Sequence, residues 1–441
     1  MNKDLLKIAE LACDRARSRG AKQAGASVRR SRHYKMMVRD GKLEELASSE
    51  SRGLSLRVFV DGRYGQHSTC DLERRALLRF VDDAVEMTRF LMPDRHRALP
   101  EPELYKGRST RDMGLYDPDH ARVTMDERRR LTMEGHDAAR AAGGDKVLSV
   151  GSGYYDKVSE QVLVQTNGFS DHERRTTYGM WVDVSVRDEK LDKRPSDWAE
   201  TMARRRSGLG RPEAVGKEAA RRALAQIGAD KIDSCTLPVV VENRAVGRLL
   251  DGLLAPLSGW ALDQKRSCFD GREGQLVAAK TLSLIDEPLL ERGWGSRRFD
   301  GEGITARRLP IIADGVLKNL YVDTYYGRKL GRPPTTGGSS NLVFSAGEGD
   351  AGALCAAAGK AILITAFIGG NSNSTTGDFS HGLAGFLVEN GERVRPVASM
   401  NLSGSHLELW KQLERLGDDP YPHASRRTPS LLFRPMQVAG R

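Results

Sequence analysis

The stretch Leu54-Ser-Leu-Arg-Val-Phe-Val60 alternates between apolar and polar side chains and leads directly into Asp61-Gly62. Alternation with a period of two residues is typical of a β-strand with one buried face. An Asp-Gly pair favours the tight turn of a β-hairpin, and a second such pair stands upstream at Asp40-Gly41. This part of the chain therefore predicts an antiparallel sheet. The side chains expected on its buried face are Leu54, Leu56, Val58 and Val60.

Helical periodicity surrounds these strands. Apolar side chains one turn apart predict one helix that ends at Gly20 and another between Asp71 and Pro93. A third helix is predicted to begin at Thr124, which forms a capping box with Glu127. Since helices and strands come in runs and do not alternate regularly, the pattern favours the α+β class.

The second half of the chain has a different pattern. After Asp188 the sequence is charged and lacks apolar periodicity, so we predict a linker there. Strand and turn signals then dominate, with hairpin pairs at Asp314-Gly315 and Asn390-Gly391, and a late helix is expected over 405–416. The predicted organisation is an N-terminal α+β domain of antiparallel sheet with long helices (1–190), a linker with a connecting helix (191–230), and a C-terminal, predominantly antiparallel β domain with a few helices (231–441).

Composition and charge narrow the function classes. The 441-residue chain has 69 basic and 59 acidic residues, which gives a formal net charge of +10. The basic clusters stand among acids, so solvated faces explain them better than a nucleic-acid track, and we expect no specific nucleic-acid binding. The five cysteines are scattered without a C-x-x-C pair, which argues against a disulfide framework. No apolar run approaches the ~20 residues that span a bilayer, and the N-terminus lacks a signal-peptide layout, so we expect a cytoplasmic protein without membrane contact.

The apolar run Cys235–Val241 predicts a buried strand, and the residues after it begin a helix. A catalytic zinc helix needs two side chains with lone pairs one turn apart and a carboxylate beside them. Asn243 is a poor zinc ligand, and Arg248 has no acceptor atom. Arg244 stays protonated and is unsuited to act as a general base. We therefore predict no catalytic residue and no metal at these three positions. The two arginines either bind a carboxylate of a partner or the C-terminus of a bound peptide, or they are solvated or paired within the chain.

Other segments, taken together and in order, resemble the TldD/TldE (PmbA) family of two-subunit zinc peptidases. The matching segments are Leu54–Val58 with Asp61-Gly-Arg63, Thr166–Phe169, Ala214–Ala220, Phe299–Ile304, Asp314–Leu317, Thr375–Phe379 and Val388–Glu392. The resemblance places Asn243, Arg244 and Arg248 where catalytic subunits of the family carry His-Glu-x-x-x-His. It also implies a cysteine ligand near the C-terminus, whereas the last cysteine here is Cys355.

The resemblance thus implies a TldE/PmbA-type subunit that lacks catalytic residues and a cofactor of its own. It implies a dimer, either with a TldD-type partner that carries the zinc or with a second copy, that encloses a cavity and degrades or processes unfolded peptides. Two alternatives stay open. One is a stand-alone metallopeptidase with unrecognised ligands, and the other is a regulatory binding protein without proteolysis, such as a modulator of DNA gyrase.

Two polar segments are the remaining candidates for a site. Thr375-Thr-Gly-Asp-Phe-Ser-His381 is a family-matching segment, and the resemblance implies that it is structural or lines the cavity between subunits. The residues predicted to contact substrate are Thr376, Gly377, Asp378 and His381. A metal site assembled from His381 with Asp378 and His406 is an alternative that the sequence leaves open. Thr335-Thr-Gly-Gly-Ser-Ser340 lacks the lysine of a phosphate-binding loop, so we expect no nucleotide there.

Overall fold

A long, curved antiparallel sheet forms the first half of the protein. The computed structural model describes residues 3–441, and its six-stranded first sheet has the order β3-β2-β1-β4-β5-β6. Every neighbouring pair in this sheet is antiparallel. The strands are β1 (Gln23–Arg39), β2 (Lys42–Val60), β3 (Arg63–Thr69), β4 (Val147–Gln165), β5 (Ser170–Val186) and β6 (Ser196–Ala203).

The two predicted Asp-Gly hairpins are confirmed. Asp40-Gly41 connects β1 to β2, and Asp61-Gly62 connects β2 to β3. Both residues of each pair have positive φ, at 50° and 77° in the first turn and 50° and 73° in the second. These angles match the turn type whose twist suits antiparallel strands, and aspartate and glycine tolerate them better than bulky residues do.

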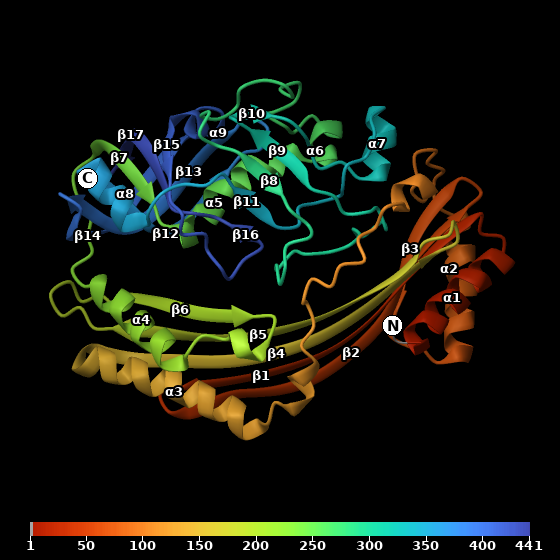
Figure 1. The fold of residues 1–441 in the computed structure, drawn as a ribbon, viewed down its shortest axis with the longest axis horizontal. Coiled ribbons are helices and arrows are strands. Elements are labelled where there is room, and N and C mark those ends of the chain that lie inside the picture. Colours follow the sequence, from red (N-terminus) through yellow and green to blue (C-terminus); the bar gives the residue numbers. More distant parts are fainter. Residues whose placement is uncertain (1–2) are drawn as a thin grey trace.

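A pair of helices covers each end of the first sheet (Figure 1). Helices α1 (Lys3–Ser18) and α2 (Arg74–Arg89) form one core with β1, β2 and the end of β4. Helices α3 (Met125–Gly143) and α4 (Pro212–Ala225) form another with β4, β5 and β6. The Thr124 half of the predicted capping box is confirmed, since its hydroxyl accepts from the Glu127 amide at 3.2 Å, whereas the Glu127 carboxylate pairs with Arg206. The four alternating residues of β2 are at most 1% exposed, as predicted.

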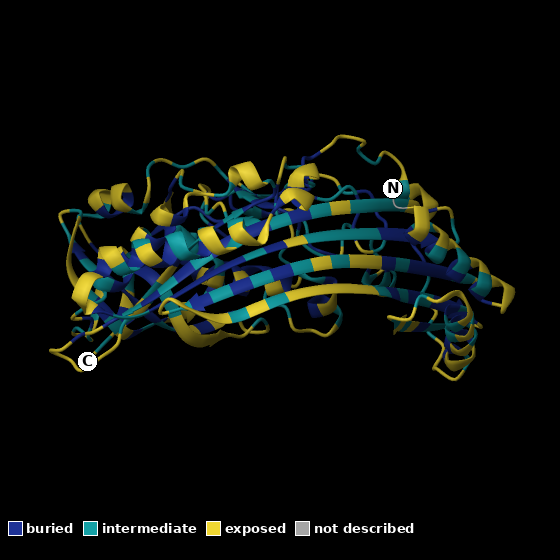
Figure 2. Cartoon of the chain, turned by 90° about the horizontal axis from the view of Figure 1, so that it is seen from below, coloured by how far each residue is buried: buried dark blue, intermediate teal, exposed yellow. Residues whose placement is uncertain are grey.

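Between the two helix pairs the strands are only partly covered. Figure 2 views the sheet from below and shows exposed and half-buried positions along the strands there. The first part of β2, over 42–52, is largely exposed. The central ladder between β1 and β4 runs the full length from Gly25 opposite Gln165 to Arg39 opposite Gly151 and joins the two ends.

The second half of the protein contains two further sheets and lies on the concave side of the first sheet (Figure 1). The larger sheet has the order β14-β13-β12-β7-β17-β15, and β14 also pairs with β17. The smaller sheet has the order β10-β9-β8-β11-β16. The strands of the larger sheet are β7 (Cys235–Val241), β12 (Lys360–Ser372), β13 (Asp378–Glu389), β14 (Glu392–Ser405), β15 (Leu413–Leu416) and β17 (Leu431–Ala439). Those of the smaller sheet are β8 (Leu284–Asp286), β9 (Leu309–Ala313), β10 (Val316–Leu317), β11 (Leu342–Phe344) and β16 (Arg426–Arg427).

Helices accompany these sheets, and the α+β class is confirmed. Most strand pairs are antiparallel, and the exceptions are β7 with β12 and β11 with β16. The helices of this half are α5 (Asn243–Leu254), α6 (Gly259–Asp263), α7 (Thr324–Leu330), α8 (Ala351–Ala358) and α9 (His406–Leu409). Among the described residues, no helix is both long and apolar enough to cross a membrane.

Two predictions about the chain's organisation are corrected. The segment predicted as a linker and connecting helix, 191–230, contains β6 and α4, which belong to the first sheet and its core. β6 is an edge strand with one buried face, so its exposed charges masked the strand pattern. The helix predicted over 405–416 ends at Leu409, and Leu413–Leu416 instead pairs with β17 as strand β15. Tertiary pairing overrides helix propensity there.

Candidate functional site

The start of α5 is attached to the first domain by an ion pair. Glu242 precedes the helix and is 8% exposed. Its carboxylate accepts two hydrogen bonds from Arg222 of α4, at 2.8 and 3.0 Å. Arg222 also contacts Glu218 on its own helix at 2.9 Å. Such a two-pronged guanidinium–carboxylate contact fixes orientation as well as distance, so α5 begins at a defined place relative to α4.

Asn243 connects the first turn of α5 to the C-terminal segment. Its side-chain amide donates to the carbonyl of Asp419 at 2.7 Å. Its backbone N–H donates to the hydroxyl of Ser430 at 3.0 Å, and its carbonyl accepts from Thr428 at 2.8 Å. The residue at this position therefore holds the chain between β15 and β17 against the helix.

The two arginines of α5 have partners within the chain. Arg244 donates to the carbonyl of Trp198 at 3.0 Å and to the carboxylate of Asp197 at 3.1 Å, both on β6. Its guanidinium also lies 4.1 Å from the centre of the Trp198 ring. Arg248 is exposed and donates to the carbonyl of Gly370 in the turn region of β12. Of the alternatives that the sequence leaves open for the two arginines, the structure shows pairing within the chain.

These residues do not fit a zinc ion. The Asn243 amide is engaged with Asp419, and Arg244 and Arg248 offer only donors. Over residues 3–441, no three histidine, cysteine, aspartate or glutamate side chains gather in a way that would hold a metal. We therefore derive no catalytic step from zinc at this helix.

The predicted substrate-contact residues lie in the hairpin between β12 and β13, but they do not form one cluster. The hydroxyl of Thr376 donates to the carboxylate of Asp378 at 2.7 Å, and both residues are exposed. Gly377 has φ of +85°, which shapes the turn. His381 is 1% exposed. The structure thus separates an exposed polar turn from a buried imidazole.

His381 shares a serine with His406. The hydroxyl of Ser372 lies 3.2 Å from Nε2 of His381 and 3.1 Å from Nε2 of His406. The His406 ring packs 4.8 Å from the Phe379 ring and lies directly over Gly252 of α5, where a Cβ would overlap it. From the sequence, His406 is a candidate only as a metal ligand, and Ser372 is no candidate. The three residues meet through strand pairing, which their spacing along the chain does not indicate.

The electrostatics of this group argue against nucleophilic catalysis. Burial lowers the pKa of His406 to about 4. Burial and the nearby Arg248 cation lower the pKa of His381 as well. An imidazole with so low a pKa is a weak general base at neutral pH. Nδ1 of His406 also has no partner that would orient the ring. Asp378 is engaged with Thr376, so the alternative metal site does not assemble either.

The contact of Arg244 with β6 leads to a stability prediction. Arg244→Ala is expected to lower the free energy of unfolding by about 2 kcal/mol, because it removes two hydrogen bonds from a cation whose side chain is 11% exposed, together with a stacking contact. Arg248→Ala, which removes one exposed contact on the same helix, is expected to cost less than about 0.5 kcal/mol. Urea denaturation followed by circular dichroism measures both. Equal losses of stability in Arg244→Ala and Arg248→Ala would contradict the role of β6 as the stabilising partner of Arg244.

Three family profiles match most of the chain. They are the PmbA/TldA metallopeptidase domain 1 over residues 24–88, the central domain over 118–227 and the C-terminal domain over 234–440. The protein named metalloprotease PmbA from Escherichia coli O157:H7 is 28% identical over 420 residues, which cover 95% of this chain and 92% of that protein. A metalloprotease TldD homologue from Haemophilus influenzae is 24% identical over 305 residues, or 64% of this chain and 63% of its own.

Solved structures agree with these matches. A Bacteroides thetaiotaomicron protein named as a modulator of DNA gyrase superimposes with a TM-score of 0.96 and 35% identity, covering 100% of both chains. TldE from Thermococcus kodakarensis gives a TM-score of 0.86 over 98% of this chain and 100% of its own. Its 18% identity shows a shared fold alone. The profiles, the relatives and the folds all lead to one assignment: this chain belongs to the PmbA/TldD/TldE metallopeptidase family.

Proposed function

We propose that this chain is the non-catalytic, TldE/PmbA-type subunit of a cytoplasmic peptidase complex. The observation that carries the proposal is the set of side chains at the start of α5. The three positions that catalytic relatives use for chemistry here hold an amide and two guanidinium groups, and each has a partner within the chain. Arg244 joins the second half to β6, and Asn243 and Arg248 hold segments of the second half, so these side chains serve packing and not the activation of water.

In this proposal the chain acts through a TldD-type partner that carries the zinc and the general base. The exposed turn with Thr376 and Asp378 offers polar groups to a neighbouring subunit or to peptide. The curved first sheet has a long, largely exposed strand segment at 42–52, which suits contact with extended chains. The substrates are unfolded peptides, because an enclosed cavity between subunits excludes folded domains.

A binding role without proteolysis is the second candidate. The observation that favours it is the 35% identical Bacteroides protein, which is named as a modulator of DNA gyrase. In that case the chain would bind gyrase whether or not a catalytic partner is present.

An affinity purification of the tagged chain from its own cells, with mass spectrometry of bound proteins, tests the proposal. We expect a homologous chain with His-Glu-x-x-x-His in equal amounts, and peptidase activity only in the complex. Recovery of the chain alone, with zinc and chelator-sensitive activity, would contradict it. Retention of gyrase subunits from cells that lack the partner would support the second candidate.

A triple substitution tests the assignment of α5. Asn243→His, Arg244→Glu and Arg248→His together create the motif of catalytic relatives, but Glu at position 244 would face Asp197 on β6. We expect well under one equivalent of zinc per chain and no peptidase activity, because like charges disfavour the required geometry and the cysteine ligand is absent. Elemental analysis of the purified variant measures the metal. Full zinc occupancy with activity would show that only the side chains, and not their surroundings, separate this chain from a catalytic subunit.

A further inference from the structure

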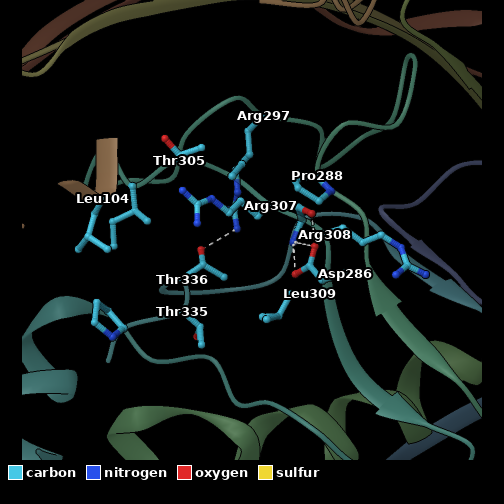
Figure 3. A pocket seen from close by; sticks show the side chains of 14 residues that line it. Leu104, Asp286, Pro288, Arg297, Thr305, Arg307, Arg308, Leu309, Thr335 and Thr336 are labelled. Atoms are coloured by element: carbon cyan, nitrogen blue, oxygen red, sulfur yellow. Dashed lines mark hydrogen bonds between the residues drawn. The ribbon is translucent and has the colours of Figure 1, made fainter. Parts of the chain in front are cut away.

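A cavity of about 250 Å³ lies where the smaller sheet of the second half meets a loop of the first (Figure 3). The segment 304–309, which leads into β9, forms one wall, and the segment 334–340 forms another. The amide of Thr305 donates to the carbonyl of Leu104 at 2.9 Å, so the first half of the chain closes one side. The cavity is separate from α5 and from the hairpin between β12 and β13 in the residues that line it.

Arg297 is held in a fixed orientation in this wall. Its Nη2 donates to the hydroxyl of Thr336 at 3.1 Å, the contact drawn in Figure 3, and to the carbonyl of Gly338. Thr336 in turn donates to the carboxylate of Asp300 at 3.1 Å. Asn341 accepts from the Gly295 amide at 2.8 Å and so fixes the loop that carries Arg297. The guanidinium is therefore placed before any ligand arrives.

Polar groups at this wall are not fully satisfied by the protein. Nε of Arg297 is buried and has no hydrogen-bond partner. Thr305 also lines the cavity, is 4% exposed, and has a hydroxyl without a partner. Buried polar groups in folded proteins are nearly always hydrogen-bonded. The wall beside this cavity thus contains two polar groups that the protein leaves unpaired.

The charge of the lining favours an anion with a single charge. Arg297, Arg307 and Arg308 all line the cavity. The opposing carboxyl of Asp286 is 2% exposed and accepts from the Ser340 amide at 2.9 Å. Burial raises the pKa of Asp286. A dianion such as phosphate would still lie close to this carboxyl, whereas a monoanion meets less repulsion.

Most of the other side chains that line the cavity are apolar. Leu104, Pro288, Ile304, Leu309 and Pro334 contribute to it. A cavity of about 150 Å³ is enough to take up benzene, so this one has room for a short aliphatic chain with a carboxylate.

We propose that this cavity binds a monocarboxylate on a short aliphatic body, with the carboxylate at the Arg297 guanidinium and the aliphatic part against the Pro288 and Leu309 wall. A carboxylate oxygen suits the guanidinium N–H groups that Thr336 and Gly338 leave free, through a single charge-assisted hydrogen bond. A free aliphatic acid and the C-terminal residue of a peptide share this chemistry. The site is formed by this chain alone, so the inference does not depend on the proposed partner.

Isothermal titration of the purified full-length chain tests the site with N-acetyl-leucine, N-acetyl-leucine amide, inorganic phosphate and a heptapeptide that ends in leucine. We expect N-acetyl-leucine to bind at least about tenfold more tightly than its amide, since an ionic hydrogen bond contributes about 1.5 kcal/mol or more. Binding of the heptapeptide as well assigns the site to chain ends, and binding of the small acid alone assigns it to free acids. Absence of binding, equal binding of the amide, or tighter binding of phosphate overturns the proposal.

Two variants locate the binding in this cavity. Arg297→Lys keeps the charge but removes the planar guanidinium that Thr336 and Gly338 orient, and it is expected to weaken N-acetyl-leucine binding by about tenfold. Arg292→Lys makes the same change at an exposed arginine outside the lining and is expected to leave binding unchanged. Ala306→Phe fills the cavity without removing a polar group, and it should abolish binding in a folded protein even where Arg297→Lys destabilises the chain. Unchanged binding in both cavity variants overturns the proposal.

Discussion

Arg222→Met is expected to lower the free energy of unfolding at neutral pH by about 3 kcal/mol. The substitution removes the guanidinium that satisfies both carboxylate oxygens of Glu242 across the two domains. The side chains of Arg222 and Glu242 are only 14% and 11% exposed, so solvent screens them little. A buried carboxylate that loses its partner keeps the cost of desolvation without the compensating attraction, and such losses are typically about 3–5 kcal/mol. We take the lower end because Arg393 remains close enough to Glu242 to interact with it.

Urea denaturation measures this effect, and a double variant serves as its control. Arg222→Met with Glu242→Gln removes the unpaired charge and should recover at least half of the lost stability. An exposed pair on the same helix, Arg221 with Glu218, provides the comparison for a surface contact, and Arg221→Met is expected to cost less than about 1 kcal/mol. If Arg222→Met costs no more than Arg221→Met, the ion pair does not couple α4 to the start of α5.

The second large effect is a loss of stability in mild acid that depends on His406. Burial lowers the pKa of His406 from 6.5 to about 4. Below about pH 6.5 the unfolded chain therefore takes up a proton that the folded protein does not, and stability falls until about pH 4. Each pKa unit corresponds to about 1.4 kcal/mol, so this one residue is expected to remove about 3 kcal/mol between these pH values. Above pH 6.5 it contributes no pH dependence.

Denaturation curves at several pH values, for the wild type and for His406→Asn, measure this effect. The variant will have a different stability at pH 7, because it changes the packing against Phe379 and Gly252, so the comparison is between slopes. We expect the slope between pH 6.5 and pH 4 to be markedly shallower in His406→Asn than in the wild type and in His33→Asn. Parallel profiles for all three proteins would show that His406 is accessible to protons in the folded state.

The sequence predicts the first sheet well because its signals are local. Asp40-Gly41 and Asp61-Gly62 each set a turn between neighbouring strands, and Thr124 caps α3 through a residue three positions on. β6 was missed because its position depends on pairing with β5 and on packing beneath α4. β15 was missed for the same reason, since four residues become a strand only beside β17.

The same difference between local and long-range signals applies to the candidate site. The unsuitability of Asn243, Arg244 and Arg248 for zinc follows from side-chain chemistry alone, so the sequence suffices to predict it. The partner of Arg244 lies 47 residues away on β6, in the segment predicted as a linker, and periodicity carries no information about it. The sequence of residues 335–340 indicates only that a phosphate-binding loop is absent, whereas the role of this segment in the structure depends on Arg297 and Asp300, which reach it through tertiary contacts.

The two separate cores of the first sheet have a consequence for how the protein forms. Residues 3–89 contain α1, the first three strands and α2, all joined by short connections, and residues 125–225 contain the other helices and strands in the same manner. Contacts close in sequence form early, and distant ones wait for the closure of long loops. Each segment therefore gathers most of one core, and the ladder between β1 and β4 brings Val162 and Val164 to complete the core beneath α1 and α2. In hydrogen-exchange experiments we expect the amides near α1 and α2 and those near α3 and α4 to open as two distinct cooperative groups.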